Sequence, residues 1–506
     1  METVTEFLNK LAGTGLRLSV EGGRLNCYAQ KGVLTTDLKD GIVRYKSEII
    51  ALLEGREKGQ PVQRVESSGR KAKEFPLSTG QKGLYILQKL QPEMGAYNVP
   101  ICFKINSPIE TEILAKAWAM VLEQFPILTA RVIEKEGDLY HRLEDGCKTT
   151  IEQRSIEFAD DEQWLSFLRK QAKQAFDLNR GPLTRIELFT QDKGKSVLLL
   201  NVHHIVFDGT SGMILLRALF TFYQQLCQGK PVHLSQDLRG YQEFVAWEEG
   251  MLGSARGAAD AGYWQQQLSG ELPILELLPD QARLGSGNLE GKTLVQELPE
   301  ELCPWVHDFS KAHSLRPSVI FLAMFQVLLH RYTNQQDIIV GMPVTRRVAP
   351  EFAAEVGYFV NMVPIRTDCE EKLKLSDFLR RVQGTMLDAV YHSGYPFPLM
   401  LERLQVKQVR KNPVFQVTYA YQNFVNQDGV IPLLQQQGLH IENVAEIVQE
   451  GEFDLGLEVF EQKTSFSLHL KYNPGLYTAN AMKGLLGHYV ALLRDKIGRA
   501  SCRERV

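Results

Sequence analysis

The residues that decide the fold are NVHHIVFDGTS, residues 201–211. They follow the apolar run SVLLL (196–200), which predicts a buried strand. They lead into SGMILLRALFTFYQQL (211–226), whose apolar spacing predicts a helix. His203 and His204 therefore stand at a strand end, next to a connection that can present reactive side chains.

Asp208 follows His204 by four residues, and Gly209 supplies a turn. A shared metal ion is not expected, because adjacent residues on a strand point to opposite faces. A structural role for both histidines is the alternative to a catalytic one. Walker A, GxGxxG, GxSxG and HExxH patterns are absent from the sequence, so this motif is the main candidate for chemistry.

The composition is that of an ordinary globular protein: of 506 residues, 44% are hydrophobic and 23% charged, with a net charge of −3. Because there is no basic excess, we expect no nucleic acid and no membrane as partner. METVTEFLNK at the N-terminus lacks the features of a signal peptide, and no run reaches the roughly 18 apolar residues of a membrane span. Seven scattered cysteines without CxxC favour a reducing compartment, so a cytoplasmic protein is expected.

The sequence divides into five parts. Residues 56–74 have almost no apolar content and predict a linker, and residues 496–506 form a polar tail. Residues 1–55 predict a small separate domain. The stretch between linker and tail is too long for one hydrophobic core, so two lobes are expected, at 75–255 and 256–495.

The N-terminal part has a pattern of helix, hairpin and helices. Apolar residues with helical spacing predict a helix over 4–11. RLSVEGGRLNCYA (17–29) alternates about Gly22-Gly23, which predicts a β-hairpin with a two-residue turn. Helical spacing returns over 34–55.

The larger part mixes helices and strands, which predicts an α/β (α+β) fold. The helices are expected at 110–125, 161–176, 210–228, 317–332 and 375–391, and the strands at 98–105, 196–203, 337–341, 413–420 and 466–472.

Seven stretches of this part, in order, resemble the motif blocks of the condensation domains of nonribosomal peptide synthetases, which belong to the wider superfamily of chloramphenicol acetyltransferase. The stretches are FPLSTGQKGLYIL (75–87), QFPILTAR (124–131), HHIVFDG (203–209), YQEFVAW (241–247), GMPVTRR with VGYFVNMVPIR (341–347 and 356–366), YHSGYPFPLMLERL (391–404) and NPVFQVTYAYQN (412–423). The departures are Gly80 for the usual alanine, Gly83 for an expected arginine and Thr210 for a common tryptophan.

The N-terminal part resembles the small docking domains at the front of some synthetase subunits, most clearly over RLSVEGGRLNCYAQKGVLT (17–35). This resemblance implies that the hairpin edge captures the C-terminal docking segment of the upstream subunit, because an edge strand offers unpaired backbone groups. A helical cap on the large domain is the alternative, and the long polar linker argues against it.

The resemblance implies two acetyltransferase-like lobes in a V-shaped pseudodimer, with the site between them. The implied activity is that of an acyltransferase that forms an amide bond. An acyl or peptidyl thioester on one carrier protein is the donor, and an aminoacyl thioester on another carrier is the acceptor. Both substrates are attached to phosphopantetheine arms of the carriers, and the chain itself is expected to bind no cofactor.

The resemblance also assigns roles within the predicted catalytic motif of His203, His204, Asp208 and Gly209. His204 accepts the amine proton or orients the amine, or else donates to the oxyanion. His203 faces inward and is structural, and Gly209 keeps the tunnel open. Asp208 forms a structural salt bridge with an arginine, for which Arg347 is the match, although an arginine also precedes it.

Two further residues are expected along the substrate tunnel, Ser211 and Asn361. Ser211 can also cap the helix that follows it. The segments around Asn361 and at 412–423 match parts that cross between the lobes in the family.

Other members of the superfamily are alternatives. The two histidines exclude a heterocyclase, and Gly209 disfavours an epimerase or a terminal cyclising form. A stand-alone acyltransferase, ester formation and a non-catalytic module that recruits carriers remain open. Because the sequence shows neither an adenylation signature nor a carrier serine motif, donor and acceptor carriers are expected as partners.

Overall fold

The computed structural model describes residues 17–21, 24–28, 39, 42, 73–144, 151–156, 160–191, 195–235, 238–275, 277, 291–347, 349–370, 373–404, 414–423 and 440–498. The chain divides into two units, Met1–Lys71 and Ala72–Val506. The predicted helices of the first unit, most of the predicted linker and the tail from 499 lie outside the described residues, except that Lys39 and Ile42 have helical backbone.

The first unit contains the predicted hairpin. β1 (Arg17–Glu21) pairs antiparallel with β2 (Arg24–Tyr28), in the register that sets Leu18 opposite Cys27 and Val20 opposite Leu25.

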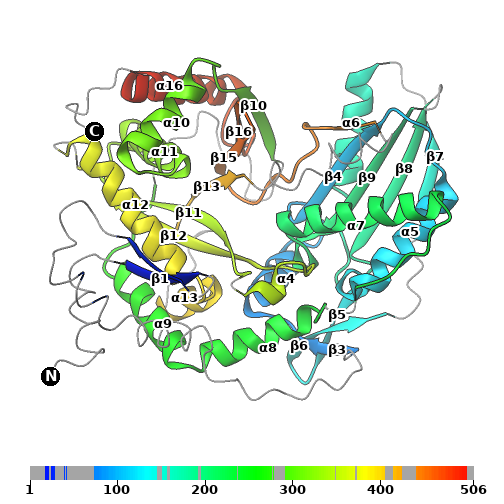
Figure 1. Cartoon of the computed structure of the whole chain (residues 1–506). Helices are drawn as coiled ribbons and strands as arrows, with labels where there is room; N and C mark the ends of the chain where they lie inside the picture. Colours follow the sequence, from blue (N-terminus) through cyan, green and yellow to red (C-terminus); the bar gives the residue numbers. More distant parts are fainter. Residues whose placement is uncertain are drawn as a thin grey trace. The chain divides into compact units, whose positions relative to one another are not determined.

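The N-terminal half of the second unit is built on a five-stranded sheet (Figure 1). Its strands, in spatial order, are β14 (Ile441–Asn443), β4 (Asn98–Ile105), β9 (Lys195–His203), β8 (Thr184–Gln191) and β7 (Glu152–Ser155). Two packed helices, α5 (Thr111–Gln124) and α7 (Gly209–Cys227), bury residues such as Trp118 and Leu215 against the sheet. α6 (Asp161–Ala172) belongs to a separate hydrophobic cluster, in which its Trp164 and Leu168 pack with Phe189 of β8.

A smaller sheet lies in the same half. Its strands are β3 (Glu74–Pro76), β6 (Asp138–Leu143) and β5 (Ala130–Lys135), and η1 (Pro126–Thr129) leads into β5. α4 (Thr79–Leu90) follows β3 and begins with a complete capping box between Ser78 and Gln81. α8 (Tyr241–Leu252) contributes Phe244 and Val245 to this core.

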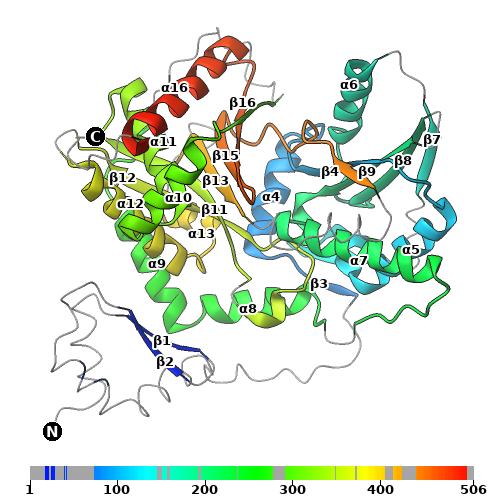
Figure 2. The same ribbon diagram turned by 45° about the horizontal axis from the view of Figure 1, so that its top comes forward.

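The C-terminal half has a six-stranded sheet. In spatial order its strands are β10 (Lys292–Glu297), β16 (Phe466–Tyr472), β15 (Leu455–Glu461), β13 (Val417–Gln422), β11 (Asp337–Thr345) and β12 (Val360–Asp368). Among the described residues, the helices of this half are α9 (Ala255–Gln267), α10 (Leu302–His313), α11 (Pro317–Thr333), α12 (Leu375–Tyr391), α13 (Phe397–Leu404) and α16 (Ala479–Gly498). Figure 2 shows α10, α11 and α16 together beside the sheet.

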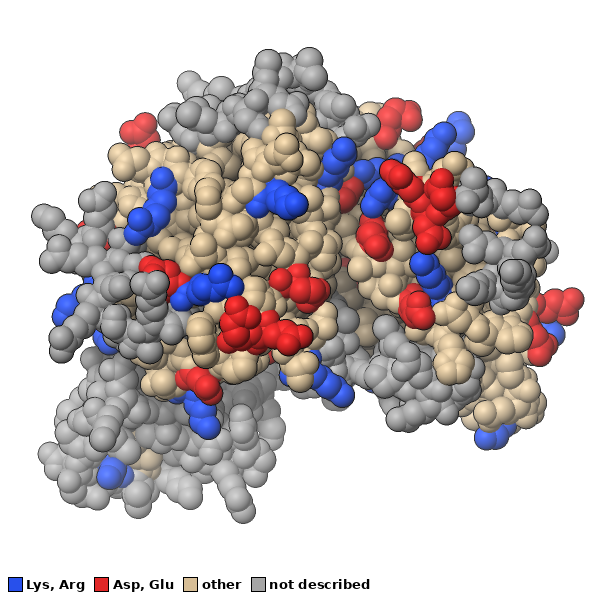
Figure 3. Space-filling view, turned by 90° about the horizontal axis from the view of Figure 1, so that it is seen from above, with Lys and Arg blue, Asp and Glu red and all other residues tan. Residues whose placement is uncertain are grey.

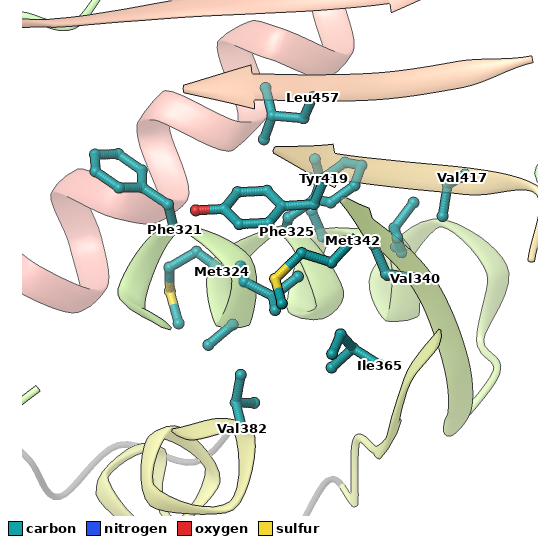
Figure 4. Close-up of a cluster of buried hydrophobic side chains, with 14 of the residues drawn as sticks. Phe321, Met324, Phe325, Val340, Met342, Ile365, Val382, Val417, Tyr419 and Leu457 are labelled. Carbon is teal, nitrogen blue, oxygen red and sulfur yellow. The ribbon is translucent and has the colours of Figure 1, made fainter. Parts of the chain in front are cut away.

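α11 is the central helix of this core. Every residue from Val319 to His330 is buried, because α11 lies among α10, α12, α16 and β11. Figure 4 shows Phe321, Met324 and Phe325 of α11 in one buried cluster with Tyr419 of β13 and Val382 of α12. A helix that is apolar on all sides is typical of the interior of a large domain.

Most expected elements lie close to their predicted ranges, and the differences have local causes. α6 ends at Ala172 rather than 176, where the Asn98 side-chain amide donates to the carbonyls of Ala172 and Gln174. β11 runs on to Thr345 because it stays paired with β12 up to Val360. The expected strand 413–420 is displaced, since β13 begins at Val417.

Two segments of the C-terminal half join the N-terminal half. β14 pairs with β4, and Phe352, Val356 and Phe359 pack in the N-terminal core. The prediction that 412–423 crosses is wrong for the described part, 414–423, because β13 lies inside the six-stranded sheet, where β15 and β11 occupy both of its edges.

We propose a lobe boundary at 255/256. It is supported by the packing of α8 in the N-terminal core, whereas Ala261 and Trp264 of α9 pack in the C-terminal core.

Among the described residues, no single helix has the length and apolar character of a membrane span. The bent pair α10 and α11 passes by length and composition, but it makes an angle of 104°, and α11 is buried in the core. On the face seen in Figure 3, basic and acidic side chains are interspersed rather than gathered by sign.

Candidate active site

The candidate site begins where β9 ends. Residue pairing between β9 and β4 continues to His203, which lies opposite Asn98. The chain then turns into η2 (His204–Val206), and the His204 amide donates to the Tyr97 carbonyl at 2.8 Å. The two histidines thus leave the strand in different directions, as adjacent strand residues must.

His203 is directed into the protein interior and has no exposed surface. Its Nδ1 accepts the Ile205 amide at 3.1 Å, so the ring proton resides on Nε2, 3.4 Å from Gln88 Oε1. Burial lowers the pKa of His203 to about 3, which keeps the ring neutral. With both nitrogens engaged inside the core, His203 is placed to hold the loop rather than to meet a substrate.

His204 is part-buried and lines a cavity. Its Nδ1 lies 2.6 Å from the Phe207 carbonyl oxygen. A carbonyl only accepts, so Nδ1 must carry the proton of this hydrogen bond. In the neutral ring Nε2 is therefore the nitrogen with a lone pair, and the backbone of the motif itself fixes this tautomer.

Tyr358 is a residue of the site that the sequence did not indicate. Its ring meets the His204 ring edge to face, with centroids 5.2 Å apart. A Cβ at Gly80 would lie 2.9 Å from Tyr358 Cε1, so the glycine in the first block makes room for this ring. The departure from the usual alanine at position 80 was the available signal, but its partner is far away in the sequence.

Asp208 is buried and fully engaged. Oδ1 accepts the Ser211 amide at 2.7 Å, which makes Asp208 the N-cap of α7, and Oδ2 accepts the Phe359 amide at 3.1 Å. The Arg347 guanidinium binds both oxygens, at 2.8 and 3.2 Å, and stacks on the Phe359 ring. Asp208 is therefore placed to hold the loop and not to exchange protons with a substrate.

The neighbouring arginine has a different partner. Arg346 pairs with Glu248 of α8, and both side chains are almost completely buried. Glu248 also accepts the Thr79 amide at 2.7 Å, and the nearby Gln81 donates to the Ile205 carbonyl at 2.6 Å. The Gln81 contact holds η2 directly, and the Glu248 contacts hold the start of α4, which carries Gln81. The sequence did not indicate these contacts, because each joins distant parts of the chain.

Ser211 does not lie where it was expected. It has no exposed surface and is not among the cavity-lining residues. Its hydroxyl donates to the Gly357 carbonyl, and it accepts from the Gly357 amide and from Arg347. The tunnel assignment and the capping role are both wrong for Ser211, because Asp208 caps α7 and Ser211 points into the seam between the halves.

Asn361 lines the cavity, as expected, but its side-chain amide forms hydrogen bonds to backbone groups of the protein itself. Its amide nitrogen donates to the carbonyls of Ser393 and Tyr395, and its oxygen accepts the Phe397 amide at 2.9 Å. Gly209 is exposed and also lines the cavity, at the first turn of α7.

The cavity has a volume of about 1200 Å³ and is lined by both halves of the second unit. Tyr97 and Met213 contribute from the N-terminal half, and Val344, Phe415 and Glu458 from the C-terminal half. This volume holds far more than one amino acid and suits two extended substrates that meet beside His204.

No activated nucleophile is evident among the cavity-lining residues that the structure describes. Cys102 lies on the wall, but burial raises the pKa of its thiol to about 12, so it is not a thiolate at neutral pH. What the site offers is a cavity in which Nε2 of the neutral His204 ring is available as an acceptor. This combination suits proton transfer and positioning on substrates that are already activated.

The fold and the histidine motif are those of a condensation domain, and the comparisons agree. The chain matches the Condensation domain family over residues 71–504 and the TubC N-terminal docking domain over residues 4–54, so it belongs to the condensation-domain family. It is a condensation domain of the nonribosomal peptide synthetase or hybrid polyketide synthase type, preceded by a docking domain.

Among curated relatives, the chain is 37% identical over 419 residues to "Polyketide synthase PksN" of Bacillus subtilis (strain 168), covering 82% of this chain and 8% of that protein. It is 25% identical over 497 residues to "Bacitracin synthase 2" of Bacillus licheniformis, covering 97% of this chain and 18% of that protein. Among solved structures, it shares its fold with a four-domain nonribosomal peptide synthetase bound to AMP and glycine, with a TM-score of 0.77 and 21% identity over 87% of this chain and 34% of that one. The chain thus spans less than a fifth of the curated relatives described here.

Proposed function

We propose that the chain catalyses amide-bond formation between two carrier-bound thioesters. The amine of an aminoacyl thioester attacks the carbonyl of an acyl or peptidyl thioester, and the donor chain passes to the acceptor. The observation that carries this proposal is the Nδ1–H hydrogen bond of His204 to the Phe207 carbonyl, which leaves Nε2 as an acceptor on the cavity wall.

This tautomer favours one order of events at His204. Nε2 of the neutral ring can accept the hydrogen of the attacking amine, but it can donate to the tetrahedral oxyanion only after it has taken a proton. Accepting from the amine is therefore the first role, worth about 10²–10⁴-fold. Because a thioester is already activated, no covalent enzyme intermediate is required.

Positioning supplies the rest. Two phosphopantetheine arms that deliver their thioesters into one cavity make the reaction effectively unimolecular, worth up to roughly 7–11 kcal/mol in ideal cases. The Asp208–Arg347 pair and the Arg346–Glu248 pair support this by fixing the loop that carries His204. We further propose that the two halves are acetyltransferase-like lobes in a V, for which the separate sheets and cores are the support.

The partners follow from the same proposal. The edges of the β1–β2 hairpin suit an extended C-terminal segment of an upstream subunit, which would add a strand by backbone hydrogen bonds. The two carriers bring the substrates, and the chain itself uses no further cofactor. A cytoplasmic location, expected from the sequence, is part of the proposal.

The test uses two loaded carriers and intact-protein mass spectrometry. One carrier bears an acyl group, the other an aminoacyl group, and the mass of the acceptor carrier is followed with and without the chain. Gain of the donor mass, dependent on the chain and on both loaded arms, is the expected result. If carriers bind but no mass is transferred across a panel of donors, the chain is a recruiting module and the proposal fails.

A further inference from the structure

One wall of the cavity is polar. β15 and β16 are neighbours, and their alternate residues line the cavity, because side chains of one face repeat every two positions. Three of these residues, Glu458 of β15 with His469 and Lys471 of β16, are termed the polar wall. The mechanism proposed above assigns them no role.

The three side chains form a connected group. Glu458 lies directly opposite His469 in the strand register, and Lys471 is the diagonal neighbour of Glu458 on the same face. Lys471 Nζ lies 2.7 Å from Glu458 Oε1, and the two side chains are 19% and 21% exposed. Lys471 keeps two further N–H donors, and the second oxygen of Glu458 is an acceptor.

His469 supplies the observation that points to a ligand. It is 7% exposed, and its Nδ1 is buried with no hydrogen-bond partner among the residues that the structure describes. The Phe460 ring packs against the imidazole, with centroids 4.4 Å apart. The His469 side chain lines the cavity, and an unpaired buried nitrogen is costly unless a bound group satisfies it.

The other half contributes an apolar wall. Val99, Ile101 and Phe103 of β4 and Met213 and Leu216 of α7 line the same cavity. A chain that occupies this space meets hydrocarbon on one side and an ion pair with an imidazole on the other. The volume of about 1200 Å³ leaves room for a long donor, whereas a single amino acid needs much less.

We propose that the polar wall selects donor acyl chains that carry hydroxyl or amide groups over plain saturated chains. A hydroxyl or amide of the donor accepts from Lys471 and donates to Glu458 or His469. A saturated chain would displace water from these three side chains without forming hydrogen bonds to them. Polar groups left unpaired in this way lower the rate with the saturated donor, so the site prefers the donor that can form the hydrogen bonds. This inference rests on the proposed function and names the substrate class of the same site.

The test is a competition between two loaded donor carriers. One carries a saturated acyl chain and the other a chain of equal length with one or two hydroxyl groups at varied positions. The ratio of acceptor products gives the ratio of kcat/KM. We expect the wild type to prefer at least one hydroxylated chain by about 10–100-fold, and we expect Glu458→Leu and Lys471→Met, which remove the hydrogen-bonding groups, to bring the ratio much closer to one. Lys483→Met, on the exposed surface of α16, is the matched control and should keep the wild-type ratio.

Calorimetric titration with the corresponding acyl-pantetheine amides gives a second readout that needs no catalysis. Tighter binding of the hydroxylated compound to the wild type, lost in both wall variants, supports the polar wall. Equal reaction and equal binding of both compounds, or a preference that survives in both variants, overturns it and leaves the proposed function intact. Absence of product from every donor, with selective binding retained, contradicts the proposed function and keeps the polar wall.

Discussion

The Arg347 guanidinium binds both oxygens of Asp208, at 2.8 Å to Oδ2 and 3.2 Å to Oδ1, and lies over the Phe359 ring, 4.0 Å from its centroid. Asp208 caps the helix that follows the histidine motif, whereas Arg347 follows a strand of the C-terminal half. The pair therefore joins the two halves directly behind His204. Because the same aspartate also accepts two backbone amides, its charge is fully compensated in a buried place.

Removal of one partner should destabilise the protein. Asp208→Ala leaves the Arg347 charge buried without its carboxylate, and we expect a loss of about 3–5 kcal/mol in the free energy of unfolding. Chemical unfolding followed by circular dichroism measures this loss. Asp208→Asn keeps the cap but removes the charge and should lose less. Unchanged stability with abolished transfer would instead make Asp208 part of the chemistry.

The tight contact between Gly80 and Tyr358 gives a second prediction. In Gly80→Ala the added Cβ would lie 2.9 Å from Tyr358 Cε1, so the ring must move and its contact with His204 must change. We expect kcat for transfer to fall several-fold, with a loss of stability of about 1–3 kcal/mol from overpacking. Gly262→Ala in α9 is the control, because no residue that the structure describes lies within 4 Å of its Cβ position. It should leave kcat unchanged and stabilise the helix by about 0.5–1 kcal/mol. Unchanged kcat in Gly80→Ala would contradict a role for the Tyr358 ring.

Two fully buried histidines predict how stability depends on pH. Burial lowers the pKa of His203 and of His141 to about 3, below the usual 6.5. Between these values the unfolded chain binds protons that the folded chain cannot, so stability falls as pH drops from about 6.5 towards 3. The slope reaches about 1.4 kcal/mol per pH unit for each histidine.

His141 tests this dependence in isolation. Neither of its ring nitrogens has a hydrogen-bond partner among the described residues, and it lies between Phe75 and Tyr241. His141→Leu should reduce the dependence of the free energy of unfolding on pH by the contribution of one histidine, and it should raise stability at acid pH. Urea unfolding midpoints measured between pH 4 and pH 7 check it. An unchanged slope would show that His141 is charged or solvated in the folded protein.

The sequence predicted what local patterns determine. The β1–β2 hairpin, the strand that ends at His203 and helices such as α12 follow from periodicity and turn residues, and all are present. Only the resemblance to the family indicated that Asp208 pairs with Arg347 rather than Arg346, because nothing in the local sequence distinguishes two neighbouring arginines. The two arginines follow the end of β11, and the structure pairs Arg346 with Glu248 and Arg347 with Asp208.

Contacts between distant segments were not predictable. Ser211 was expected on the tunnel because it follows the motif, yet the docking of Gly357 and Arg347 against it buries the hydroxyl. The crossing strand β14 is three residues long and carries no strong strand pattern. The polar wall lies on two strands in which polar and apolar residues alternate as in any half-exposed sheet. A role in binding is therefore indicated only by the cavity that these residues line.

The most direct test of the central claim measures the rate of transfer with His204→Ala beside the wild type. Donor and acceptor carriers are loaded, and the acceptor mass is followed over time by intact-protein mass spectrometry, with unfolding curves to show that both proteins are equally folded. We expect the wild type to transfer the donor and His204→Ala to be slower by about 10²–10⁴-fold. Equal rates for the two proteins would contradict this expectation, because transfer would then depend on positioning alone.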